Sequence, residues 1–193
     1  MKNSREFEIA WMGLKPGVHE YSYELNDHFF AEHEAPVDMH DWKVGIKLRF
    51  DRHASFFRLH FDVGGTVTLP CDRCGDPFPL SLWDEFDLLV KLSGEEDVHP
   101  EDDDADVTFI SRTESVINVA DWLYEFSLLS LPLQRIHPNN ADGTPGCNPQ
   151  ALRLLGELSE PEELPSGENN PWKGLDALKE KNLNEDSEKQ EPL

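Results

Sequence analysis

The sequence has no long apolar run, and this absence restricts its relation to membranes. No segment approaches the roughly 20 consecutive apolar residues that a membrane-spanning helix needs. Residues 1–6 are not followed by the apolar core of a signal peptide. We therefore expect a globular protein of the reducing cytosol, with a core built from the 38% of residues that are hydrophobic.

Basic residues are scarce. Lysine and arginine number 17 against 39 aspartate and glutamate residues, which gives a net charge of −22. A protein that binds a phosphate backbone by itself normally has a basic face. The charge therefore disfavours naked RNA and anionic membranes as partners, and it favours a basic protein surface.

Enzyme motifs are also lacking. The sequence has no phosphate-binding glycine loop, no dinucleotide fingerprint and no Ser/His/Asp arrangement. The acidic run at residues 101–104 follows Gly94 and Pro100, where we expect a mobile loop and no catalytic metal site. We therefore expect a protein that is not an enzyme.

Only three cysteines are present, an odd number that argues against a disulfide framework as the basis of the fold. Cys71 and Cys74 are separated by two residues, so both sulfurs can point into one turn and bind one ion. Gly75 permits the left-handed backbone that such a turn often needs. A redox dithiol and an ordinary pair of half-buried cysteines remain alternatives.

Alternation of apolar and polar residues predicts several strands. Residues 19–25, 44–50, 57–69 and 78–90 alternate in this way, and residues 107–110 form a shorter candidate. Val67 and Leu69 keep the parity of Phe61 and Val63, so we expect one long strand through Gly64-Gly65. The cysteine turn then connects two strands of a long antiparallel hairpin.

One main helix is predicted after Asn118, which can cap it. The apolar residues that follow have helical spacing, and the helix closes before Pro132; they are Val119, Trp122, Leu123, Phe126 and Leu129. The predicted fold is therefore α+β, with an antiparallel β-sheet or partly closed β-barrel covered by this helix.

Two further metal-ligand candidates follow that helix. With Cys71 and Cys74, His137 and Cys147 complete a Cys₃His set, which is a known zinc composition. The nine residues between His137 and Cys147 exceed the usual finger spacing, so the sequence permits a zinc site without demanding one.

The ends of the chain carry weaker patterns. A short strand is expected at residues 6–11, and Phe29-Phe30 can anchor a solvated loop that contains His28, His33 and His40. We place the α+β domain at residues 1–156, with a short helix after Asn148. Residues 157–193 are expected to form an acidic linker, a second short helix and a disordered tail.

Four blocks in this order resemble the YceD family, the large ribosomal RNA subunit accumulation proteins. They are residues 65–74, the helix end at 128–133, His137 with Cys147, and residues 170–175. The resemblance implies a bacterial or organellar cytosolic protein that supports synthesis, processing or stability of large-subunit ribosomal RNA. The acidic loop and the linker before Trp172 look like insertions relative to the family.

Taken with the charge, the resemblance predicts a non-enzymatic factor that contacts a basic ribosomal protein or a large-subunit assembly particle. The alternative is a Cys-x-x-Cys redox or metal-handling protein. No helix is predicted directly after the cysteines, which argues against the redox alternative. In redox Cys-x-x-Cys proteins a helix N-terminus lowers the pKa of the reactive thiol.

Overall fold

The computed structural model describes residues 4–94 and 107–159. The chain divides into two compact units, Met1–Asn148 and Pro149–Leu193, and each is described by itself. The expected boundary after residue 156 stays a prediction, because most of the second unit lies outside the described residues.

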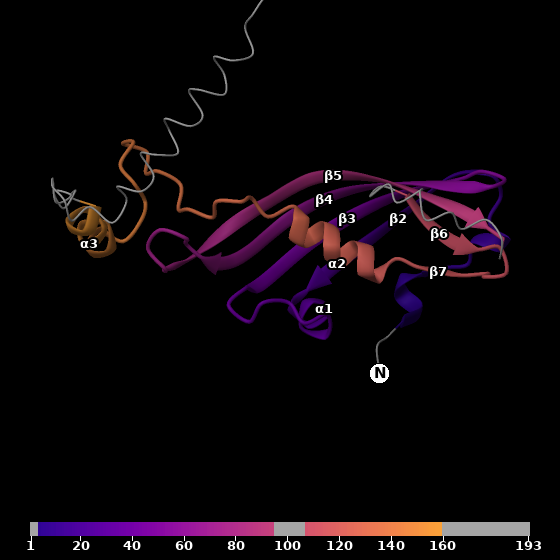
Figure 1. The fold of residues 1–193 in the computed structure, drawn as a ribbon, viewed down its shortest axis with the longest axis horizontal. Helices are drawn as coiled ribbons and strands as arrows, with labels where there is room; N and C mark the ends of the chain where they lie inside the picture. Colours follow the sequence, from indigo (N-terminus) through magenta and orange to yellow (C-terminus); the bar gives the residue numbers. More distant parts are fainter. Residues whose placement is uncertain (1–3, 95–106, 160–193) are drawn as a thin grey trace, which may run out of the picture. The chain divides into compact units, whose positions relative to one another are not determined.

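The first unit is built on a five-stranded sheet of order β2-β3-β4-β5-β6 (Figure 1). The first four strands are antiparallel neighbours, and β6 runs parallel to β5. Their bounds are β2 (Gly17–Asn26), β3 (His40–Arg52), β4 (Phe56–Pro70), β5 (Pro77–Ser93) and β6 (Val107–Ser111). All five strands, including the single long β4, were expected from the alternation.

The expectation of an antiparallel sheet needs one correction, because β6 makes the sheet mixed. Residues 94–106 connect β5 to β6, and this length suffices for the crossover of a dozen or so residues that parallel neighbours need. Within the described residues the sheet is open, so the alternative of a partly closed barrel was wrong. The α+β class itself is confirmed.

The core lies on one face of this sheet. The register places Leu48 opposite Phe61 and Phe50 opposite Leu59, and all four side chains are fully buried. Such pairs arise because alternate residues of neighbouring strands share a face. The pattern of residues 44–50 and 57–69 therefore maps directly onto the buried face.

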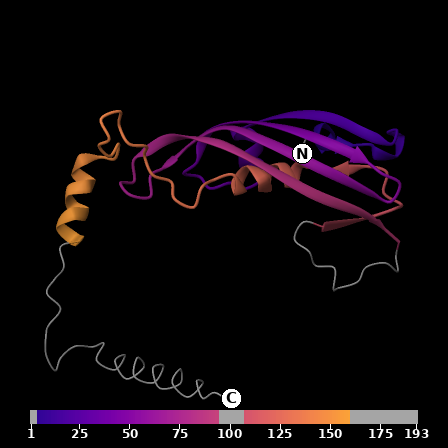
Figure 2. The ribbon, with the colours of Figure 1, turned by 90° about the horizontal axis from the view of Figure 1, so that it is seen from above.

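Helix α2 (Ala120–Leu129) lies alongside the strands in both views (Figures 1 and 2). The Phe126 ring stacks on Phe86 at a centroid distance of 4.5 Å and lies 4.8 Å from Phe61. Leu123 is fully buried. The N-cap is Val119 and not Asn118 as expected, but Asn118 accepts a hydrogen bond from the Ala120 backbone N–H at 2.9 Å and so stabilises the start of the helix. The helix that covers the sheet is thus confirmed.

The N-terminal segment differs from the expectation. Between the 3₁₀ turns η1 (Ser4–Phe7) and η2 (Trp11–Gly13), only β1 (Glu8–Ile9) is a strand, and it pairs with β7 (Ile117–Asn118). The expected histidine loop begins as helix α1 (Asp27–Glu32).

Three side chains explain why α1 forms. Asn26 caps the helix by accepting hydrogen bonds from the backbone N–H groups of His28 at 3.0 Å and Phe29 at 3.4 Å. Phe29 and Phe30 are buried, so their role as an anchor is confirmed. Sequence reasoning missed the helix because six residues are too few for a periodic pattern.

In the second unit the structure describes helix α3 (Pro149–Ser159), which the sequence predicted after Asn148. The acidic run at residues 101–104, the linker, the second short helix and the charged tail fall outside the described residues. No described helix is long and apolar enough to cross a membrane.

Candidate metal centre

Cys71 and Cys74 lie in the tight turn that joins β4 to β5. The Gly75 backbone N–H donates to the Cys71 carbonyl at 2.8 Å, and the Cys71 N–H donates to the Asp76 carbonyl at 3.0 Å. Gly75 has a φ of 78°, the left-handed conformation that glycine adopts without a steric penalty. The turn therefore forms as predicted and places both cysteines on one side of the hairpin end.

His137 and Cys147 come from the loop that follows α2. This loop folds on itself, with Asn139 bridged to Pro145 and the Asn140 N–H donating to the Thr144 carbonyl at 2.8 Å. The fold brings the two ends of the segment together. The nine intervening residues are thus accommodated by a small hairpin of their own, which explains a spacing longer than that of a finger.

The four candidate ligands converge at the end of the β4–β5 hairpin. One ligand atom from each of Cys71, Cys74, His137 and Cys147 lies within 4.8 Å of the other three. The Cys71 and Cys147 sulfurs are 3.8 Å apart, and the Cys74 sulfur is 3.4 Å from His137 Nδ1. Cys71 and Cys147 are buried. The structure therefore brings together all four residues that the sequence selected.

Neighbouring groups hold these ligands in place. The Phe78 ring packs against the His137 imidazole at a centroid distance of 4.6 Å. The Asn148 side-chain amide donates to the Asp76 carboxylate at 3.0 Å, which ties the residue after Cys147 to the turn. Such contacts orient metal ligands and reduce the ordering that binding requires.

The thiol pKa values differ within the cluster. Burial raises the pKa of Cys71, but hydrogen bonds from the backbone of His137, Cys74 and Arg73 and from the His137 side chain lower it overall, to about 6. Burial, the contact with Cys71 and repulsion from Cys71 and Cys74 raise the pKa of Cys147. Because zinc binds thiolates, Cys71 is better prepared than Cys147 to form a metal bond.

This donor set fits zinc. Three sulfurs and one imidazole nitrogen match the tetrahedral Cys₃His composition of structural zinc sites, and they do not match the oxygen ligands that calcium or magnesium prefer. Four protein donors would fill the coordination sphere, which leaves no position for substrate. The cysteine turn leads into strand β5 and not into a helix, so the redox alternative lacks the helix N-terminus that often lowers the pKa of a redox thiol.

A second polar cluster lies on the outer face of the sheet. His60 Nδ1 is 2.8 Å from Asp87 Oδ1, and its Nε2 is 3.3 Å from Asp62 Oδ1 and 4.0 Å from Glu85 Oε2. These residues are neighbours on adjacent strands, so pairing of one imidazole with three carboxylates accounts for the contacts. The cysteine cluster is therefore the stronger metal candidate.

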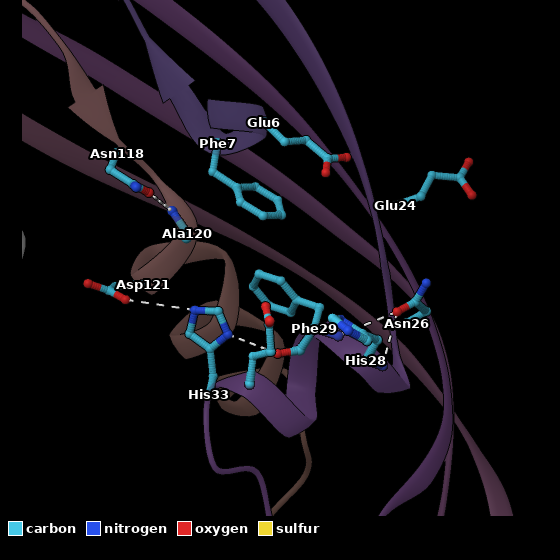
Figure 3. A pocket seen from close by; sticks show the side chains of 11 residues that line it. Glu6, Phe7, Glu24, Asn26, His28, Phe29, His33, Asn118, Ala120 and Asp121 are labelled. Carbon is cyan, nitrogen blue, oxygen red and sulfur yellow. Dashed lines mark hydrogen bonds and ion pairs between the residues drawn. The ribbon is translucent and has the colours of Figure 1, made fainter. Parts of the chain in front are cut away.

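Sequence reasoning missed a cavity beside α1. Figure 3 shows the side chains that line it, drawn from η1, β2, α1, β7 and the start of α2. His33, which was assigned to a solvated loop, lies in its wall, and only 8% of its side chain is exposed. No spacing signal marks this site, because its residues come from five segments that only the fold brings together.

The fold and the cluster define a small α+β protein with one Cys₃His cluster at the tip of a β-hairpin. A family model described as "Large ribosomal RNA subunit accumulation protein YceD" matches residues 59–179, more than half of the 193 residues. The chain therefore belongs to the YceD family, as the sequence blocks predicted.

All four candidate ligands fall inside the matched residues, whereas β2, β3 and α1 precede them. No significant match to a curated protein was found, and none to a solved structure.

Proposed function

We propose that this protein is a non-catalytic factor that supports the accumulation of large-subunit ribosomal RNA by binding a basic protein partner. The partner is a ribosomal protein or an assembling large-subunit particle. The observation that carries the proposal is the family match over residues 59–179, because the family is named for accumulation of that RNA. The net charge of −22 supports a protein partner over naked RNA.

The cysteine cluster supports a structural role in this factor. Cys71, Cys74, His137 and Cys147 would hold a zinc ion, which would join the β4–β5 hairpin to the loop after α2. Zinc supplies four bonds between segments far apart in the sequence, so its binding free energy would become folding free energy. A fully coordinated ion performs no hydrolysis, in agreement with a factor that is not an enzyme.

The zinc proposal is tested on the purified protein by elemental analysis and by thermal unfolding with and without a chelator. We expect one zinc per chain and a lower melting temperature after chelation. His137→Asn should lose the zinc, whereas the matched control His53→Asn, at an exposed histidine before the opposite end of β4 from the cysteine turn, should retain it. A melting curve that chelation leaves unchanged would contradict the proposal.

The redox alternative rests on the 3.8 Å between the Cys71 and Cys147 sulfurs and on the lowered pKa of Cys71. Thiol titration of the protein as purified separates the two readings. Three freely reactive thiols that form a reversible disulfide, with no zinc present, would favour redox chemistry. Thiols that react only after chelation would favour the metal.

The ribosomal role is tested by deleting the gene in its source organism and separating ribosomal particles on sucrose gradients. We expect fewer large subunits and less large-subunit RNA, with small-subunit RNA retained. Affinity purification of the tagged protein, read by mass spectrometry, should recover basic ribosomal proteins, and recovery should survive ribonuclease treatment. Normal gradients after deletion would overturn the proposal.

A further inference from the structure

The cavity beside α1 has a volume of about 480 Å³ and is separate from the cysteine cluster. Its walls come from η1, β2, α1 with the adjoining His33, β7 and the first turn of α2 (Figure 3). The cavity thus lies where five segments meet, and its volume is large enough to admit a side chain of a partner.

The lining of the cavity is acidic. Four carboxylates line the cavity, no lysine or arginine does, and the four are Glu6, Glu24, Glu32 and Asp121. Within the described residues, none of the three glutamates makes an ion pair with a basic side chain. An occupant with positive charge would therefore be attracted, and one with negative charge repelled.

His33 adds an acceptor to this lining. Its Nδ1 lies 2.8 Å from the Phe29 carbonyl oxygen. A carbonyl can only accept, so Nδ1 carries the hydrogen, and in the neutral imidazole Nε2 is left as an acceptor. This Nε2 faces Asp121 Oδ1 across 3.9 Å. In that neutral form, Nε2 and the Asp121 carboxylate are two acceptors 3.9 Å apart, and one donor group of a ligand can bridge them.

Aromatic faces complete the wall. Phe7 and Phe29 line the cavity, and their ring centroids are 5.2 Å apart. Phe29 is buried and packs against His33, so the half-buried Phe7 ring is the aromatic surface that an occupant can reach. A planar guanidinium combines the properties that this lining selects, because it stacks on aromatic rings and donates several hydrogen bonds in one plane. An ammonium group is a point charge that stays more strongly hydrated, so it fits the aromatic wall less well.

We propose that this cavity binds an arginine side chain of a basic protein partner, with the guanidinium donating to Asp121 and to His33 Nε2 while it stacks on the aromatic wall. The inference rests on the proposed function for the existence of a basic partner, and it adds the surface and the residue type through which that partner is recognised. None of the four candidate metal ligands lines the cavity.

A peptide titration of the full chain tests the proposal. The probe is N-acetyl-Gly-Arg-Gly-amide, and the matched peptide replaces arginine by citrulline, which keeps the shape and removes the charge. In two-dimensional NMR spectra we expect saturable shifts at Phe7, Phe29 and His33 with the arginine peptide alone. A lysine peptide should bind more weakly than the arginine peptide.

Two variants locate the binding. Asp121 is 85% exposed, so Asp121→Asn should fold normally. It should weaken arginine-peptide binding by at least about fivefold, since a hydrogen bond to a charged group is lost. Glu125→Gln removes one charge from the same helix, outside the cavity. It should leave binding unchanged.

Equal binding of the citrulline or lysine peptide, equal loss in Glu125→Gln, or absence of saturable shifts would overturn the inference. These results are independent of the ribosomal role. Peptide binding with normal gradients after deletion would reject the proposed function alone. Defective gradients without peptide binding would reject the arginine site alone.

Discussion

Asp72 and Arg135 lie 63 residues apart in the sequence and are joined by three hydrogen bonds. The Asp72 backbone N–H donates to the Arg135 carbonyl at 2.8 Å. In return, the Arg135 backbone N–H and its Nη2 donate to the two Asp72 carboxylate oxygens at 2.7 Å and 3.0 Å. Asp72 stands next to Cys71, and Arg135 stands two residues before His137. The pair therefore fixes the distance between two candidate ligands without a metal.

Replacement of either residue should weaken zinc binding, but by different amounts. Asp72→Ala removes the acceptor of two hydrogen bonds, whereas Arg135→Ala removes only the side-chain bond and keeps both backbone contacts. We therefore expect the affinity for zinc to fall more in Asp72→Ala than in Arg135→Ala. Competition with a metal-binding dye measures both affinities, and the reverse order would contradict the role assigned to the carboxylate.

The same pair predicts an effect of pH on the zinc-free protein. Hydrogen bonds from the Arg135 backbone and side chain, together with its charge, lower the pKa of Asp72 below its ordinary value of 3.8 in spite of some desolvation. A lowered pKa in the folded state means that the stabilisation is fully present above pH 3.8 and is lost as the pH falls through the folded-state pKa.

Urea unfolding in the presence of a chelator, followed from pH 5 to pH 3, checks this sign. The stability of the wild type should fall more steeply at the acid end than that of Asp72→Asn, which cannot titrate at this position. Parallel curves for the two proteins would show that Asp72 does not contribute. Arg135→Lys, which keeps the charge, should behave like the wild type more closely than Asp72→Asn does.

Gly146 should be sensitive because the loop after α2 packs on itself there. A Cβ at this position would collide with the Pro138 carbonyl oxygen and lie 3.5 Å from His137 Cβ. Gly146→Ala should therefore displace His137 and lower the zinc content of the purified protein. Gly156→Ala, where an added Cβ meets no atom within 4 Å, is the control and should keep its zinc. Full zinc occupancy in Gly146→Ala would contradict this packing.

Adjacent glycines in β4 should differ in the same way. At Gly65 an added Cβ would collide with the Lys43 carbonyl oxygen and approach Val44 Cα to 2.7 Å, because β3 bulges against this point. Gly65→Ala should lower the free energy of unfolding by about 1–3 kcal/mol, the usual cost of overpacking. Gly64→Ala finds open space and should change it by less than about 1 kcal/mol. Similar unfolding curves for the two variants would show that β3 and β4 do not approach closely here.

Sequence periodicity was sufficient for the elements with regular burial. Strands β2 to β5 and helix α2 each bury one face, so the spacing of apolar residues marks them directly. The parity of Val67 and Leu69 even distinguished one long strand from a hairpin at Gly64-Gly65. The elements that were wrong or missed, η1, η2 and α1, are short, and a segment of three to six residues has no measurable period.

The candidate metal ligands were found from composition, whereas their convergence was decided by the tertiary structure. Residue type and the two-residue spacing selected Cys71 and Cys74 and made His137 and Cys147 plausible partners. Their meeting within 4.8 Å depends on the Asp72–Arg135 pair and on the small hairpin between His137 and Cys147. Such contacts join distant residues through individual hydrogen bonds, which leave no period in the sequence.

The sequence by itself determined the α+β class, the family and the identity of the four candidate ligands, because these follow from residue types and from their spacing along the chain. Only the tertiary structure decided the parallel β6, the open sheet and the acidic cavity around His33. These features depend on which distant segments become neighbours, and packing of the whole core determines those neighbours.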